Sequence, residues 1–218
     1  MAAPTNTLVS TTLSGISNRE DLSDTIYRIS PTQTPLLNMA AKGKATNTLH
    51  EWQTQDLAVN ANNAQAEGDT LVAKVVTVPV RLTNKTQISA KAVFVSGTQL
   101  KVNSAGFKDA MSYELSLAGL EIKRDIETGL TQNNVTASAP RQSRGLVGWA
   151  GDNVDSGAGY VAPVYSATNT AQTDGTQAAF TEARLKNVLQ KVFVAGGEPN
   201  VVMMGAAQKQ TFSTFTGM

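Results

Sequence analysis

The sequence contains no cysteine, a single histidine and few aromatic residues. The absence of cysteine excludes disulfides, thiolate metal sites and cysteine nucleophiles, and it is in keeping with folding inside a cell. The one histidine, His50, leaves no second imidazole for a zinc site built on two histidines. We therefore expect no catalytic residues, no metal site and no cofactor, and a fold stabilised by packing or by assembly.

The chain also lacks a charge imbalance and a long apolar run. Its 218 residues include 18 Lys and Arg against 17 Asp and Glu, so bulk charge indicates no nucleic-acid partner. No stretch approaches the roughly 18 apolar residues of a membrane span, and the N-terminus lacks a basic start followed by an apolar run. We expect a soluble, unexported protein of one large or two small domains, in which 41% hydrophobic residues can form a core.

The first 35 residues combine a polar arm with a proline-rich elbow. Residues 1–18 are rich in Thr, Ser and Asn and are typical of an extended arm. Residues 20–29 have helical spacing, and the pattern stops at Ser30 because a residue before proline is pushed out of the helical region. The two prolines of Ser30-Pro31 and Thr34-Pro35 then predict a rigid change of direction.

Alternating apolar and polar residues predict a long β-hairpin between residues 45 and 82, followed by a further strand pair. Residues 48–53, 72–82 and 88–94 each place their apolar side chains on one face, and a polar tip at 59–70 separates the first two. Because an isolated hairpin is marginally stable in water, we expect this one to pack on something outside the chain.

One long amphipathic helix is predicted over residues 104–131, where apolar residues recur at steps of three and four. It would be about 42 Å long at 1.5 Å per residue, with Asn103 or Ser104 as its N-cap. We expect its apolar stripe to face the sheet of its own domain. The stripe consists of Phe107, Met111, Leu115, Ile122 and Ile126.

The C-terminal third combines long loops with α/β-like elements. Residues 137–179 are loop-rich, and Thr181 caps a predicted helix that ends at Gly196-Gly197. Residues 201–204 are typical of a short buried strand, and residues 206–215 of a further helix.

No motif in the chain predicts catalysis. His50-Glu51 begins like a zinc-protease helix, but no histidine follows four residues later, so His50 is predicted to be a polar strand residue. Residues 157–162 fit a dinucleotide-binding spacing, yet Pro163 stands where the helix should begin, which indicates a loop. Ser143 lacks the G-x-S-x-G motif of a serine hydrolase.

Two groups of carboxylates are predicted to be solvated. Asp152, Asp155 and Asp174 lie in Gly-rich loops without the alternating ligands of a calcium loop. Glu121, Asp125 and Glu127 alternate with basic residues on the long helix, which is typical of a charged surface.

Five blocks of the sequence carry a resemblance to a known family. They are REDLSDTIYRISPTQTPLLNMAAKGKATNTLHEWQTQDL at 19–57, TQISAKAVFVSGTQ at 86–99, ELSLAGLEIKRDIETGL at 114–130, RGLVGWA at 144–150 and GGEPNVVMMGAAQKQTF at 196–212. In this order, and over nearly the whole chain, they resemble the tailed-bacteriophage major capsid proteins with the Hong Kong 97 fold.

The resemblance implies an α+β (mixed α/β) chain with the Hong Kong 97-like capsid fold. Residues 1–40 would be the N-terminal arm, 41–85 an extended β-hairpin loop lying over a neighbouring subunit, 86–139 the peripheral domain with the spine helix 104–131, and 140–218 the axial domain. The implied arm elbow is Ile29, Ser30, Pro31, Thr34 and Pro35, and the implied loop residues are Trp52, Glu67, Gly68 and Asp69. The family fold continues past the position of Met218, so the axial domain is expected to be incomplete.

The implied function is structural: copies would assemble as pentamers and hexamers into an icosahedral or prolate head shell around double-stranded DNA, without sequence-specific binding, membrane contact or catalysis. Scaffold, portal and decoration proteins are the implied further partners. The protein would be assembled in the host cytoplasm and reside in the virion capsid. An encapsulin-like compartment shell, which shares the fold and encloses cargo enzymes, is the alternative. An α/β enzyme would need the glycine-rich loops of residues 145–175 to form a ligand pocket.

Overall fold

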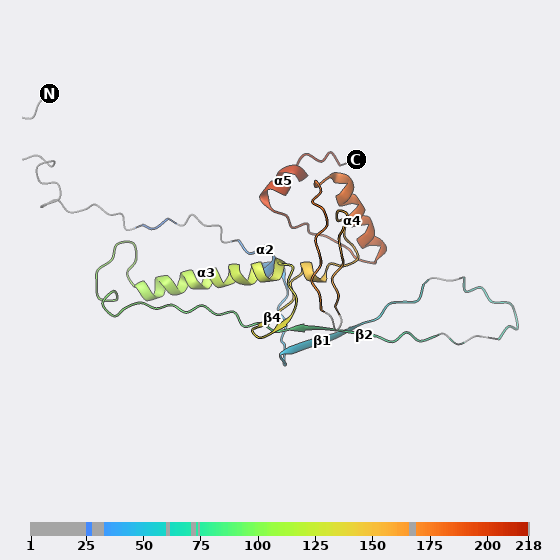
Figure 1. The fold of residues 1–218 in the computed structure, drawn as a ribbon, viewed down its shortest axis with the longest axis horizontal. Helices are drawn as coiled ribbons and strands as arrows, with labels where there is room; N and C mark the ends of the chain where they lie inside the picture. Colours follow the sequence, from blue (N-terminus) through green and yellow to red (C-terminus); the bar gives the residue numbers. More distant parts are fainter. Residues whose placement is uncertain are drawn as a thin grey trace, which may run out of the picture. The chain divides into compact units, whose positions relative to one another are not determined.

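A computed structural model describes residues 25–27, 33–59, 62–70, 73, 75–165 and 169–217 (Figure 1). Helices and small antiparallel sheets occur together, which confirms the α+β class. The elements in chain order are α2 (Pro35–Met39), β1 (Leu49–Thr54), β2 (Val80–Lys85), α3 (Ala110–Thr131), β3 (Ala137–Ser138), β4 (Arg141–Gln142), the 3-10 helix η1 (Val147–Trp149), α4 (Glu182–Val194) and α5 (Ala206–Phe212).

The chain separates into two compact units, which are described one at a time. Unit 1 consists of Met1–Gln33 and Lys91–Ile122, and unit 2 consists of Thr34–Ala90 and Lys123–Met218. Helix α3 begins in unit 1 and ends in unit 2.

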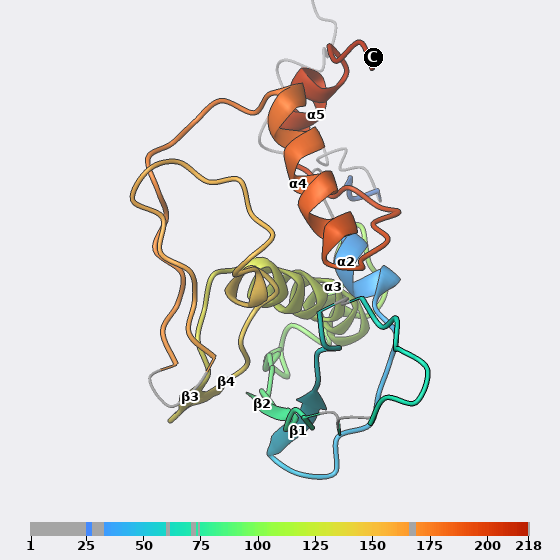
Figure 2. The same ribbon diagram turned by 90° about the vertical axis from the view of Figure 1, so that its right-hand side faces the viewer.

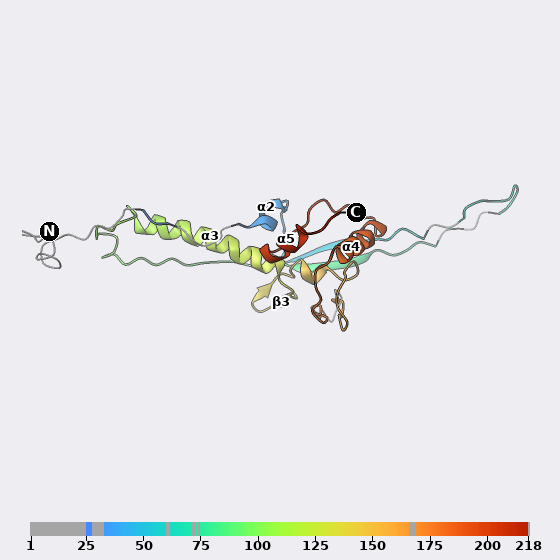
Figure 3. The same ribbon diagram turned by 90° about the horizontal axis from the view of Figure 1, so that it is seen from above.

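The predicted hairpin is present in unit 2, but its paired part is short. Strands β1 and β2 pair antiparallel from Leu49 opposite Lys85 to Thr54 opposite Val80. Beyond them the described residues between 55 and 79 belong to no strand and continue as two separated arms (Figures 1 and 3). Of the strand predicted at 72–82, the described residues form a strand only from Val80 onward. The residue before it, Pro79, has no N–H to donate to a ladder.

Helix α3 begins six residues later than the sequence pattern predicted. Gly106 has a φ of 87°, outside the helical region, and Asp109 directly precedes the first helical residue. The Asp109 carboxylate accepts hydrogen bonds from the Ser112 hydroxyl and, at 3.1 Å, from the Met111 N–H. These bonds, the one from Ser112 first, lower the pKa of Asp109. Asp109 thus performs the capping role predicted for Asn103 or Ser104, while the predicted end at Thr131 is confirmed.

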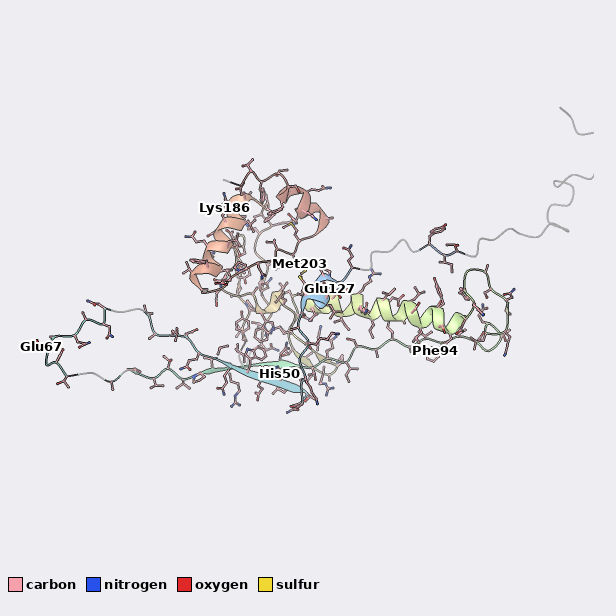
Figure 4. The ribbon with its side chains drawn as sticks, turned by 180° about the vertical axis from the view of Figure 1, so that it is seen from behind. His50, Glu67, Phe94, Glu127, Lys186 and Met203 are labelled. Atoms are coloured by element: carbon pink, nitrogen blue, oxygen red, sulfur yellow. The ribbon has the colours of Figure 1, made fainter. Side chains whose placement is uncertain are left out.

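An extended segment, residues 91–96, runs beside α3 within unit 1 (Figure 4, where Phe94 is labelled). Lys91 Nζ lies 2.9 Å from Glu121 Oε2, and a hollow of about 670 Å³ separates the rest of the segment from the helix. In the described part of the chain, residues 88–94 belong to no strand, so the strand pair predicted there is wrong.

Very little apolar surface is buried in either unit. Within the described ranges, Ala110 is the one hydrophobic side chain classed as buried. Of the predicted helix stripe, Phe107, Ile122 and Ile126 are half-buried, Met111 is exposed, and Leu115 is 63% exposed. The described residues thus leave Leu115 largely and Met111 partly uncovered, and the predicted core role of the stripe stays a prediction.

Helices α4 and α5 form the last part of unit 2, and both were expected from the sequence. The Thr181 hydroxyl accepts the Arg184 N–H at 3.4 Å, and Gly196, with a φ of 84°, follows the end of α4. Helix α5 lies near the first turns of α4 (Figure 2), where a hollow of about 490 Å³ includes Val188 and Gln208 in its lining. The buried strand predicted at 201–204 is wrong, because the segment pairs with no strand among the described residues and is largely exposed.

The predicted helix at residues 20–29 lies mostly outside the described residues. The three described residues in that range, 25–27, are not helical. Ile29, Ser30 and Pro31 of the predicted elbow also lie outside the described residues.

The two faces of α3 predict different responses to truncation. In dilute subunits, Leu115→Ala should change the free energy of unfolding by less than about 0.5 kcal/mol, because this side chain is exposed. Leu117→Ala should cost about 1 to 2 kcal/mol, because Leu117 is half-buried and lines the hollow beside residues 91–96. Urea titration of both variants measures the difference, and an equal loss from the two would contradict this assignment of faces.

Candidate assembly interface

The side chain of Arg144 in unit 2 is only 3% exposed. Its Nη1 donates to the Gly148 carbonyl at 2.9 Å, and its Nη2 donates to the Val164 carbonyl at 2.9 Å and to the Asn169 side-chain oxygen. Burial lowers the pKa of the guanidinium, which nevertheless remains charged at neutral pH. A buried charge is tolerated when its donors are satisfied in this way.

Aromatic rings enclose this guanidinium. It lies 5.3 Å from the centre of the Trp149 ring and 5.4 Å from that of Tyr165, and these two rings stack with centres 5.1 Å apart. Trp52 of β1 adds a third ring, 5.2 Å from Trp149. Cation–π contacts of this kind are strongest where water is excluded.

The hairpin is attached to this group through β2 as well. The Arg144 N–H donates to Asn84 Oδ1 at 2.9 Å, and Asn84 Nδ2 donates back to the Arg144 carbonyl at 3.4 Å. We call Arg144, Trp149, Tyr165, Trp52 and Asn84 the Arg144 cluster. The cluster fixes the root of the hairpin to the loop that contains η1. Its contacts therefore set the direction in which the rest of the hairpin extends from its root.

Two tyrosine hydroxyls close the loop around the cluster. Tyr165 donates to the Trp149 carbonyl at 2.8 Å, and Tyr160 donates to the Ala150 carbonyl at 3.0 Å. Burial, and to a smaller extent the negative charge of Asp152, raises the pKa of both hydroxyls. Both are therefore protonated donors at neutral pH.

The described part of the elbow is tied to α3. Thr34 is buried and Pro35 is the first residue of α2. The two carboxylate oxygens of Glu127 accept the Leu36 and Leu37 N–H groups, each at 2.8 Å. A carboxylate at a helix N-terminus satisfies otherwise unpaired donors. Glu127 is thus a capping residue, and its prediction as part of a charged surface was wrong.

The far end of the hairpin is a tight turn flanked by two acids. The Ala66 carbonyl accepts the Asp69 N–H at 3.2 Å, and Gly68 has a φ of 81°, a conformation that favours glycine. Glu67 lies at the opposite end of the hairpin from His50 of β1 (Figure 4). Three of the predicted loop residues therefore form this turn, whereas Trp52 belongs to the Arg144 cluster.

The arms between the strands and this turn expose large apolar side chains. Leu57 is 93% and Val78 is 83% exposed, and Val59, Val75 and Val76 are similarly open. Phe94 of unit 1 is 92% exposed. Large exposed apolar side chains in such numbers are typical of protein interaction sites.

The residues considered for catalysis form no reactive site in the described residues. His50 is an exposed residue of β1, as predicted, and the Ser143 hydroxyl donates to the Lys85 carbonyl at 2.6 Å. Gly157 lies in the loop whose spacing fits a dinucleotide-binding motif. A Cβ atom at this position would lie 1.9 Å from the Thr176 carbonyl oxygen, so glycine is needed here because two backbone segments pass close to each other. No cluster of three or more metal-binding side chains occurs in the described ranges.

One loop carboxylate predicted to be solvated is paired instead. Asp155 Oδ1 lies 3.5 Å from Arg184 Nη1, and Asp155 Oδ2 accepts Asn187 Nδ2 at 2.7 Å. Lys191 of the same helix donates to the Val154 carbonyl at 2.7 Å. These contacts fasten the loop to α4, while Asp152 and Asp174 are exposed as predicted. The described helices include none that is both long and apolar enough to span a membrane.

Comparison with known proteins identifies the family. The family model described as the SU10 major capsid protein matches residues 3–218. The chain belongs to the SU10 major capsid protein family. This membership confirms the predicted class, a structural protein of a phage capsid.

A curated relative of this SU10 family member is the major capsid protein of Escherichia phage Phieco32. The two are 28% identical over 225 residues, an alignment that covers 85% of this chain and 63% of the relative. The chain thus spans a little under two thirds of the length of the curated relative it matches.

Sequence reasoning missed the side chains that organise this SU10 family member. Arg144 appeared only as the first letter of RGLVGWA, and no local pattern connects it to Asn84 or Asn169. The one available signal was the density of Trp, Tyr and Arg near that block, because such residues need partners when buried.

Replacing the central arginine tests the Arg144 cluster. Arg144→Lys should lower the free energy of unfolding by about 2 to 4 kcal/mol, because the single nitrogen of a lysine cannot reproduce the hydrogen bonds of Nη1 and Nη2 or the planar contact with the two rings. Arg141→Lys, an exposed neighbour, is the matched control and should have little effect. Denaturant titration followed by tryptophan fluorescence reports on Trp52 and Trp149 directly. Equal stability of Arg144→Lys and the wild type would contradict a central role for Arg144.

Proposed function

We propose that copies of this chain assemble into the icosahedral or prolate head shell of a tailed phage, and that the shell encloses double-stranded DNA. The family membership supports a capsid role, and the name of the Phieco32 relative agrees with it. The Hong Kong 97-like fold is part of the proposal. A long helix, an extended hairpin and a loop-rich C-terminal region in one α+β chain are in keeping with that fold.

The observation that carries the proposal is the exposed apolar surface of the hairpin arms and of residues 88–94. Each of these side chains would gain roughly 1.5 to 3 kcal/mol on full burial, and the described part of the chain supplies no cover for Leu57, Val78 or Phe94. Such surfaces on identical subunits are covered most simply by other copies. Because each copy would contact several neighbours, weak individual contacts add up to a stable shell.

We assign each region predicted from the sequence to one part of the capsid subunit. Residues 1–40 are the arm, and the Glu127 cap of α2 supports a fixed departure point for it. Residues 41–85 are the loop that reaches a neighbour, and residues 86–139 and 140–218 are the peripheral and axial domains. Thr34 and Pro35, with Ile29, Ser30 and Pro31, aim the arm.

The partners follow from this role. Other copies, arranged as pentamers and hexamers, are the main ones, and scaffold, portal and decoration proteins are further candidates. DNA would be enclosed without sequence readout, in keeping with the balanced charge of the chain. The protein would catalyse no reaction, would be assembled in the host cytoplasm and would reside in the virion.

Electron microscopy of particles formed by the protein tests this function. We expect closed shells of uniform size, and, in particles purified from infected cells, DNA protected from nuclease. Shells that contain protein cargo and no DNA would instead indicate a compartment protein. Failure to form any closed particle at high protein concentration would contradict the shell function.

A further inference from the structure

A hollow at the root of the hairpin is lined by positive side chains. Its volume is about 320 Å³, and Lys44, Lys85 and His50 lie in its wall together with Ser143 and Trp52. No carboxylate lines it. Lys85 Nζ donates to the Ser138 hydroxyl at 2.6 Å, and in the described ranges no side chain forms a hydrogen bond or ion pair with the Lys44 ammonium. Lys44 and Lys85 thus give this hollow, the lysine hollow, two positive charges.

Two other hollows of the described chain pair a cation with a carboxylate in their lining. Lys91 lies in one with Glu121, and these two form an ion pair. Arg184 and Asp155 line another and are also paired. The lysine hollow differs from these two because no carboxylate in its lining balances the charges of Lys44 and Lys85.

The matching negative charge lies at the hairpin turn. Glu67 and Asp69 flank Gly68 and are exposed, and the described residues provide no ion pair for either. The backbone bond from Asp69 to Ala66 and the bond from the Thr70 N–H to Asp69 Oδ1 at 2.8 Å give the turn a defined shape. A preformed turn loses less conformational entropy when it binds.

We propose that the Glu67–Asp69 turn of one copy binds in the lysine hollow of a second copy. This inference rests on the proposed shell function, in which copies are brought together. It names the receptor for the hairpin tip: carboxylates of the turn pair with the ammonium groups of Lys44 and Lys85.

The turn cannot reach the hollow of its own chain. The hollow lies at the root of the hairpin, where His50 lines it. Figure 4 shows Glu67 and His50 at opposite ends of the same hairpin. A contact between turn and hollow therefore joins different copies head to tail, the type of contact from which closed rings are built.

A nucleic-acid phosphate is the competing occupant, and the observations favour the turn. Binding of a duplex in physiological salt depends on neutralising many phosphates along its length, whereas the hollow offers two lysines in a chain of net charge +1. A turn with two carboxylates matches this number of charges.

Charge exchange between turn and hollow tests the proposal. Glu67→Lys with Asp69→Lys, or Lys44→Glu with Lys85→Glu, should raise the protein concentration needed for assembly by about fivefold or more, since each contact is repeated across the shell. The chain carrying all four substitutions should assemble close to the wild type, because the pairing is restored with reversed sign. Light scattering and sedimentation of the full chain measure the assembled fraction.

The controls separate this proposal from general charge effects and from the shell function. Lys42→Glu makes the same charge change beside the hollow without lining it, and should assemble normally. Tryptophan fluorescence of unassembled subunits should match the wild type in every variant. Normal assembly of either charge-reversed pair would overturn the proposal, and so would failure of the fourfold variant to assemble. If the Lys44→Glu, Lys85→Glu variant assembled normally but retained less DNA, phosphate would be the occupant and the proposal would be wrong. A wild type that forms no shells would refute the shell function instead.

Discussion

The need to remove apolar side chains from water governs this structure. In an ordinary domain that need is met inside the chain, but in the described residues here Ala110 is the one buried hydrophobic side chain. The extended arms of the hairpin and residues 91–96 beside α3 therefore need apolar surfaces from outside the described chain to stabilise them. Membership of the SU10 major capsid protein family gives a reason for such a chain, because subunits of a shell complete one another.

Polar and aromatic contacts take over part of the organising role of a core. Arg144 is enclosed by Trp149 and Tyr165 and hydrogen-bonded to carbonyl groups, and through Asn84 it fixes the root of the hairpin. Glu127 does the same for the start of α2. The Arg144 contacts set the direction in which the hairpin leaves its root. Reproducible direction is what identical subunits need if they are to meet neighbours in the same way.

The sequence was most informative where local rules determine structure. Thr181 and Gly196 predicted the limits of α4 because capping depends on neighbouring residues, and apolar periodicity predicted α3 with a start six residues too early. It was least informative where partners are distant. The segment 201–204 has the composition of a buried strand and is nevertheless unpaired among the described residues. No pattern in the residues around Arg144 predicts that it joins two loops to a hairpin. Apolar content indicates that a segment will be buried, but it does not say by which chain.

The central claim is that the exposed apolar segments are covered by other copies, and amide hydrogen exchange tests it most directly. The measurement compares dilute subunits with assembled particles. We predict fast exchange at residues 75–79 and 88–95 in subunits and strong protection in particles, while the amides of α4 are protected in both states. Strong protection of residues 75–79 and 88–95 in dilute subunits, or none in particles, would contradict the account.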